Sequence, residues 1–148
     1  MKIKRILKIL YKFVYYNFFK IIYGNIGVII DNKFQKNINI FKIKNNKILT
    51  YTKKNYKIYQ IFFGRIYNDN VQNVAIINQN NIIEGPSYQQ INGELRSVKQ
   101  NICVNNGTPR FKKKISGRIL NLSQGASGHY NYSHWLLDIL PKLKLYSE

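Results

Sequence analysis

The sequence predicts one α/β domain, with α+β as the alternative, preceded by a basic amphipathic helix. Three observations lead to this prediction. Residues 1–24 repeat apolar side chains with a helical period, residues 25–90 alternate apolar and polar side chains as strands do, and residues 118–143 resemble a strand, a glycine loop and a helix. The length of 148 residues suits a single domain that buries a core.

The first 24 residues are expected to form a helix that stops at Gly24. At 100° per residue, one side of this helix is apolar and the opposite side is basic. The apolar side carries Ile3, Ile6, Leu7, Leu10, Phe13 and Val14, and the basic side carries Lys2, Lys4, Arg5, Lys8 and Lys12. Lysines interrupt every apolar run and no small-residue cleavage site follows, so we expect neither a membrane span nor a signal peptide. Two interpretations stay open: a helix lying on an anionic membrane surface, and a helix packed on the domain with its lysines in water.

The net charge of +18 is concentrated early in the chain. Residues 1–60 contain 14 basic residues and one acid, Asp31, whereas residues 61–148 contain 10 basic and 5 acidic residues. Such a surface attracts phosphate on lipid headgroups, nucleic acid or a nucleotide donor. Biased composition, rich in Ile, Lys and Asn, is the alternative explanation. Nucleic acid is not the expected partner, because the chain has no RNP-like signature, zinc pattern or recognition-helix pattern.

The middle of the chain is expected to be built from short strands. Residues 25–63 alternate over two or three strands, and residues 74–84 predict a hairpin with strands at 74–77 and 82–84 and a turn at 79–81. Residues 91–116 are expected to be irregular. The lone Cys103 excludes an internal disulfide, favours a reducing compartment, and is expected to be a small buried hydrophobe in an apolar–polar alternation.

The stretch from Ser123 to Leu143 holds the candidate site. A strand at about 118–122 is expected to enter a loop with Gly125 and Gly128, and a helix is expected from about Ser133. His134 and Asp138 then lie at i and i+4, so the carboxylate can orient the imidazole for general-base catalysis or phosphate binding. The alternative is a local structural pair on a helix capped by Ser133.

Two other kinds of site fit this stretch poorly. Neither Ser127 nor Ser133 lies in a G-x-S-x-G elbow, which argues against a serine hydrolase. His129 and His134 do not make up a zinc set, because such a site needs three or four ligands. No metal site is therefore expected.

The segments "GRIYNDNVQNVAII" and "KISGRILNLSQGASGHYNYSHWLLDILPKL" resemble the N-terminal half of glycosyltransferase family 61, which includes capsular polysaccharide biosynthesis proteins. The resemblance covers roughly residues 60–148. Its most specific part is a G-x-x-x-N-Y-x-H-W-L-x-D-x-L-P-R-L type segment. The matching positions are Gly128, Asn131, Tyr132, His134, Trp135, Leu136, Asp138, Leu140, Pro141 and Leu143, with Lys142 where arginine is common.

This resemblance implies half of an inverting, metal-independent GT-B enzyme with two Rossmann-like domains. Residues 25–148 would be the acceptor-side domain, and the chain would stop before the donor domain that holds the nucleotide-sugar. His134 and Asp138 are the implied catalytic residues; Gly125, Gly128, Asn131, Tyr132 and Trp135 are the implied substrate-binding residues. The chain alone is expected to be inactive.

The function expected from the sequence is thus an N-terminal glycosyltransferase fragment in surface-polysaccharide synthesis. Its expected partners are a glycan acceptor, a nucleotide-sugar through the missing domain, and an anionic membrane surface through residues 1–24. No separate cofactor is expected, and the expected location is the cytoplasm, at the inner face of the cell membrane. The alternative is a non-catalytic basic module that binds anionic membrane or nucleic acid.

Overall fold

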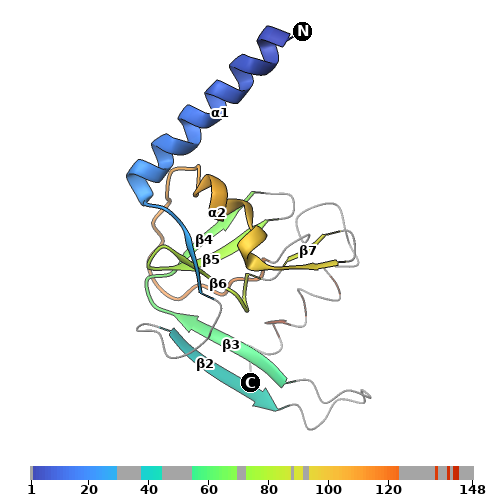
Figure 1. Cartoon of the computed structure of the whole chain (residues 1–148). Coiled ribbons are helices and arrows are strands. Elements are labelled where there is room, and N and C mark those ends of the chain that lie inside the picture. The colour runs from blue at the N-terminus through green and yellow to red at the C-terminus, as the bar shows by residue number, and fades with distance from the viewer. Residues whose placement is uncertain are drawn as a thin grey trace.

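The computed structural model of the chain describes residues 2–29, 38–44, 55–69, 73–87, 89–91 and 94–123, with positions 136, 140, 142 and 143. Over these residues the fold is an α+β arrangement. One long helix, α1 (Lys2–Tyr23), extends away from a body of short strands and a short helix (Figure 1). The coarse prediction of an N-terminal helix followed by short strands is confirmed.

Helix α1 ends where the sequence predicts. Gly24 adopts a positive φ of 79°, and its N–H donates to the Lys20 carbonyl at 2.8 Å. A glycine in this conformation closes the last helical turn at no steric cost. A Cβ at this position would lie only 2.6 Å from Nδ2 of the exposed Asn80 side chain, which would have to move to make room for it.

The central sheet has four strands in the order β1-β6-β5-β4. These strands are β1 (Gly27–Ile29), β4 (Arg65–Asn68), β5 (Val74–Asn78) and β6 (Asn81–Ile83). Strand β1 pairs with β6 in parallel, and the other pairs are antiparallel. The sheet is therefore mixed, with the helix segregated from it.

The β5–β6 hairpin confirms the predicted hairpin within one residue at its ends. Gln79 and Asn80 both have positive φ, 45° and 63°, which is the backbone of a two-residue turn that matches strand twist. Beyond two paired positions the strands separate, and side chains take over the hydrogen bonds. Ser87 Oγ accepts from the Ile76 N–H at 2.9 Å, and Asn101 Nδ2 donates to the Val74 carbonyl at 3.1 Å.

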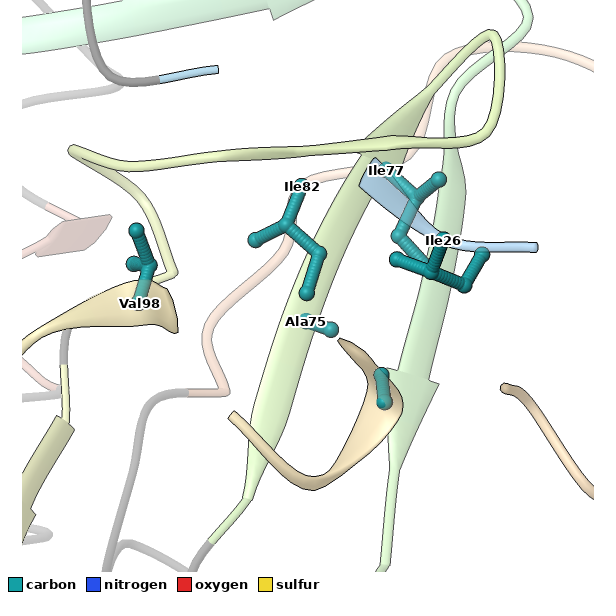
Figure 2. Close-up of a cluster of buried hydrophobic side chains, with 6 residues drawn as sticks. Ile26, Ala75, Ile77, Ile82 and Val98 are labelled. Carbon is teal, nitrogen blue, oxygen red and sulfur yellow. The ribbon is translucent and has the colours of Figure 1, made fainter. Parts of the chain in front are cut away.

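Both faces of the central sheet are covered, which explains why all five residues of β5 are buried. Figure 2 shows the cluster on one face, where Ile77 and Ala75 of β5 lie near Ile82 of β6 and Val98. The short helices η1 (Val98–Gln100) and α2 (Ile102–Asn106) contribute Val98 and Cys103 to this side. The opposite face buries Val74, Ile76 and Ile83 against residues of β2 and β3.

Two further strand pairs complete the described structure. Strands β2 (Ile38–Lys44) and β3 (Asn55–Ile61) pair antiparallel over their full length, from Ile38 opposite Ile61 to Lys44 opposite Asn55. Strands β7 (Gln89–Ile91) and β8 (Glu94–Arg96) form a small antiparallel pair. The expectation of two or three strands within residues 25–63 is confirmed by β1, β2 and β3.

The irregular region predicted at 91–116 is wrong in its first half, because β8, η1 and α2 lie there. Side-chain caps make these short helices. Ser97 Oγ accepts from the Lys99 N–H, and Asn101 Oδ1 accepts from the Cys103 N–H at 3.0 Å. Cys103 is buried as predicted, but it lies on α2 and not in an alternating strand.

The strand predicted at about 118–122 is also wrong. Residues 118–123 form no strand, and Ile119 and Leu120 are exposed. The physical reason is the lack of a neighbour: an apolar–polar alternation becomes a strand only where another strand accepts its backbone hydrogen bonds. The strand–glycine loop–helix unit therefore lacks its first element.

Candidate functional site

The site predicted from the sequence lies outside the described residues. This holds for all seven candidates: Gly125, Gly128, Asn131, Tyr132, His134, Trp135 and Asp138. The structure does describe the two ends of that segment. Lys142 Nζ donates to the Leu122 carbonyl at 3.4 Å, so the ends lie together. Leu136, Leu140, Lys142 and Leu143, described positions in the predicted helix, have helical backbone.

Helix α1 carries a long row of exposed side chains. Residues 3–14 are all exposed, and the helix leaves the body as a projecting rod (Figure 1). Its exposed large apolar side chains include Ile3, Ile6, Leu7, Leu10, Phe13 and Val14. Exposing a Leu, Ile or Phe side chain forgoes roughly 1.5–3 kcal/mol relative to burying it. An apolar face of this size indicates a binding surface.

Only the C-terminal half of α1 is fixed to the body, through an aromatic edge. Tyr15, Phe19 and Tyr23 follow one another at i, i+4 and i+8, and Phe19 is just 2% exposed. Its ring lies 5.0 Å from the Tyr15 ring and 5.9 Å from the Tyr23 ring, measured between centroids. Side chains at this spacing share one face of a helix, so a single aromatic edge holds the helix.

The partner of this edge is the extended chain after α2, residues 107–123. The Tyr15 hydroxyl donates to the Pro109 carbonyl at 2.8 Å, and the ring of Phe111 lies 5.2 Å from that of Phe19. The Tyr23 hydroxyl accepts from the Lys112 N–H at 3.1 Å. These three contacts join the helix to a segment about ninety residues later.

The apolar face of α1 lies opposite the aromatic edge that packs on the body. At 100° per residue, the side chains from Ile3 to Val14 that form the apolar face span about 120°, centred on Leu10. The packed edge is centred on Phe19, about 180° away around the axis. The apolar face therefore points away from the body. The helix does pack on the domain with its first-half lysines exposed, but through Tyr15, Phe19 and Tyr23 and not through the apolar side from Ile3 to Val14.

Positive charge lies mainly on the side of α1 opposite this apolar face. Residues 2–23 carry six basic residues and no acid. Next to the packed edge, residues 110–118 add a basic segment, which comprises Arg110, Lys112, Lys113, Lys114 and Arg118, all exposed. The sequence contains no acid between Glu94 and Asp138. The electrostatic potential around α1 and residues 110–118 therefore favours an anionic partner.

Two cations gather at the C-terminal end of α1. The guanidinium carbon of Arg65 lies 6.0 Å from the centre of the Tyr23 ring, and Lys112 Nζ lies 4.2 Å from it. Desolvation lowers the pKa of both Arg65 and Lys112, and the charge of Arg65 lowers the pKa of Lys112 further. The partial negative charge of a helix C-terminus offsets this repulsion.

Burial also shifts the pKa of two other titratable groups in the described core. Burial raises the pKa of the Cys103 thiol to about 12 and the pKa of the Tyr67 hydroxyl to about 12. A buried thiol that stays protonated is a poor nucleophile. No trio of His, Cys, Asp or Glu that could hold a metal ion is found in the described parts of the chain.

Hydropathy also limits what α1 can do in a lipid bilayer. Among the residues that the structure describes, no helix combines the length and the apolar character needed to cross a membrane. The charges in the first half of α1 are never more than four residues apart, so they interrupt any apolar span there.

Comparison with known proteins adds no relative: no family model, curated protein sequence or solved structure matches this chain. The resemblance to glycosyltransferase family 61 accordingly stays a prediction from the sequence.

The aromatic edge of α1 was missed by sequence reasoning, although the spacing of Tyr15, Phe19 and Tyr23 could have revealed it. The segment that packs on it carries no comparable pattern.

Proposed function

We propose that α1 attaches this chain to an anionic membrane surface, with the helix lying in the membrane interface. The observation that carries this proposal is the orientation of α1, whose apolar face points away from the body while its aromatic edge is fixed to it. A helix with one broad apolar face, aromatic residues and a basic opposite face is typical of interfacial membrane binding.

The alternative occupant of the apolar face is a second copy of the chain. Ile3, Leu7, Leu10, Val14 and Ile21 are spaced as in a coiled-coil seam. Charge argues against this pairing, because two α1 helices would bring twelve cations together without one acid. The apolar face is also wider than the seam of a and d positions in a coiled coil, since the exposed Ile6, Phe13 and Phe18 lie beside that seam. An anionic surface neutralises the same charges.

The test compares two neighbouring residues of the free half of α1. Leu10 and Ile9 are similarly exposed, at 54% and 58%, but Leu10 lies at the centre of the apolar face and Ile9 lies about 100° away. Leu10→Gln is expected to weaken binding to vesicles of equimolar phosphatidylcholine and phosphatidylglycerol roughly tenfold. Ile9→Gln, the matched control, is expected to change it less than threefold.

Vesicle co-sedimentation measures both affinities, and analytical ultracentrifugation without lipid measures self-association. Equal effects of the two substitutions, or no binding by the unaltered chain, would contradict the proposal. Concentration-dependent dimerisation abolished by Leu10→Gln would instead identify a second copy as the occupant.

A second proposal follows from the segment after Leu122. We propose that it forms the acceptor side of a glycosyl-transfer site, with His134 as base or acceptor-positioning residue and Asp138 orienting its ring. The motif from Gly128 to Leu143 supports this assignment, and the contact of Lys142 with Leu122 supports a segment closed on itself. The same proposal includes binding of a nucleotide-sugar donor and a GT-B architecture.

The single tryptophan, Trp135, provides the test, because it lies inside the motif. Titration with oligosaccharide acceptors is expected to change its fluorescence, and Asp138→Asn is expected to weaken that binding. Acceptor binding that leaves Trp135 emission unchanged, or no binding by any acidic or neutral oligosaccharide, would contradict the assignment. His134→Ala is expected to abolish transfer when a donor domain is supplied.

A further inference from the structure

The guanidinium group of Arg65 contains a buried donor without a partner. Its Nη2 atom donates to Asn80 Oδ1 at 3.3 Å, whereas its Nη1 atom is buried and has no hydrogen-bond acceptor in the described parts of the chain. An unpaired donor on a charged group costs more free energy than one on a neutral group. Nη1 therefore calls for an acceptor from outside the chain, either a water molecule or an anion.

Lys112 brings a second positive charge to the same place. Its Nζ atom lies 4.2 Å from the centre of the Tyr23 ring, and the guanidinium carbon of Arg65 lies 6.0 Å from that centre. The two cations are close enough for the charge of Arg65 to lower the pKa of Lys112. Within the described parts of the chain, the charges that affect the pKa of Arg65 belong to Cys103 and Tyr23, and neither is a carboxylate. The C-terminus of α1 carries about half a negative charge, which offsets only part of two full positive charges.

The hydroxyl of Tyr23 adds a third donor. It accepts from the Lys112 N–H at 3.1 Å, and no acceptor for its own proton lies among the described residues. A hydroxyl accepts and donates at the same time, so this proton can be donated to a ligand. The same hydrogen bond fixes residue 112 relative to the ring and so holds the lysine beside the hydroxyl.

This group of donors can be reached from solvent. Lys112 and Asn80 are exposed, and Arg65 is only partly buried. A solute therefore reaches the guanidinium by displacing two exposed side chains, without opening the core. A water molecule would satisfy Nη1 but would leave the repulsion between the cations, whereas a dianion relieves both.

We infer that Arg65, Lys112 and Tyr23 bind a dianionic phosphate group at the C-terminal end of α1. The planar guanidinium matches two phosphate oxygens, and the ammonium group and the hydroxyl supply further donors. A phosphate monoester or a terminal phosphate carries close to two negative charges at pH 7, which balance the two cations. The inference is independent of the proposed membrane attachment, because these residues lie at the packed edge of α1 and not on its apolar face. This position favours a phosphate on a soluble molecule over a lipid headgroup.

Inorganic phosphate is the first probe, added to the whole chain at neutral pH while sodium chloride keeps the ionic strength constant. The thermal unfolding midpoint is expected to rise with phosphate and to stay unchanged when chloride replaces it. Lys112→Gln is expected to weaken the apparent affinity for phosphate roughly tenfold. Lys113→Gln is the matched control, because residue 113 is also exposed and loses the same charge, and it is expected to change the affinity less than about threefold.

Arg65→Lys tests the fork of the guanidinium, because it keeps the charge and removes the paired donors. This variant is expected to weaken phosphate binding roughly tenfold. Lys112 is exposed, so its substitution decides the question even if the Arg65 variant fails to fold. No stabilisation beyond that given by chloride, or equal effects of Lys112→Gln and Lys113→Gln, overturns the inference.

Two further probes identify the molecule that carries the phosphate. Stabilisation by a nucleoside diphosphate at lower concentration than inorganic phosphate, lost in Lys112→Gln, is the expected result and supports a soluble carrier. Binding to phosphatidic acid vesicles that Lys112→Gln weakens and Lys113→Gln does not would support the same phosphate site with a lipid headgroup as its ligand. An unchanged vesicle affinity of Leu10→Gln contradicts the attachment of α1 and leaves this inference standing.

Discussion

The hydroxyl of Tyr23 accepts a hydrogen bond from the backbone N–H of Lys112, at 3.1 Å, and so fixes the last turn of α1 to a segment 89 residues further along the chain. The Lys112 ammonium group lies 4.2 Å from the centre of the same ring. This pair, with Phe19 and Phe111 beside it, determines which face of α1 meets the body. The apolar face stays exposed because α1 packs on the body through the aromatic edge on its opposite side.

Substitution of Phe19 tests this attachment. Phe19→Ala removes the most buried ring of α1 and is expected to lower the free energy of unfolding by about 3 kcal/mol. Phe18→Ala is the matched control, because Phe18 is adjacent but 48% exposed, and it is expected to cost less than about 1 kcal/mol. Urea unfolding followed by far-ultraviolet circular dichroism measures both. Equal costs at the two positions would show that the edge does not hold the helix.

A side chain at position 24 is expected to destabilise the protein. Gly24→Ala introduces a Cβ at 2.6 Å from Asn80 Nδ2 at a φ of +79°, and is expected to destabilise the protein by about 1–2 kcal/mol. Gly117→Ala is the control for strain alone, since Gly117 has a φ of +95° with open space around it. In the double variant Gly24→Ala with Asn80→Gly, the clash is removed and part of the loss should return. Thermal unfolding of the four proteins separates strain from clash.

Stability is expected to fall above about pH 9. The folded protein holds the Cys103 thiol protonated up to about pH 12, whereas the unfolded chain ionises it at its ordinary pKa. The stabilising difference is complete below the unfolded pKa and is lost as pH rises through the window up to the folded pKa, at about 1.4 kcal/mol per pH unit. Tyr67 acts in the same direction, with a smaller effect because it is half-buried.

Urea unfolding at pH 8 and pH 10 measures this loss. Cys103→Ala is expected to be less stable at pH 8, because it leaves a cavity, but to show a smaller decrease between the two pH values. A decrease as steep as that of the unaltered chain would show that other groups cause the alkaline instability.

The positive charge of α1 is expected to strengthen binding to anionic vesicles but not to neutral vesicles. The double substitution Lys8→Gln and Lys12→Gln is expected to weaken binding to phosphatidylglycerol-containing vesicles roughly tenfold at low salt and to leave binding to pure phosphatidylcholine unchanged. Lys57→Gln, an exposed lysine on β3, is the matched control. Vesicle co-sedimentation at several salt concentrations gives both values. An effect of Lys57→Gln as large as that of the double substitution would assign binding to overall charge.

Local patterns predicted the elements that depend on local physics. The helix ending at Gly24 and the hairpin around Gln79 and Asn80 follow from periodicity and turn chemistry, which act over a few residues. The prediction failed at residues 118–122, because a strand needs a neighbour that the sequence does not reveal. It also failed at α2, where the Asn101 side chain caps a helix too short to show a period.

The sequence by itself determined that residues 2–23 form an amphipathic helix with six cations and no acid, since helical periodicity and charge are properties of the segment alone. It also determined the motif of His134 and Asp138, whose role stays a prediction. Only the tertiary structure decided the direction of the apolar face. Tyr15, Phe19 and Tyr23 pack on Pro109, Phe111 and Lys112, and this long-range contact leaves the opposite face of the helix exposed.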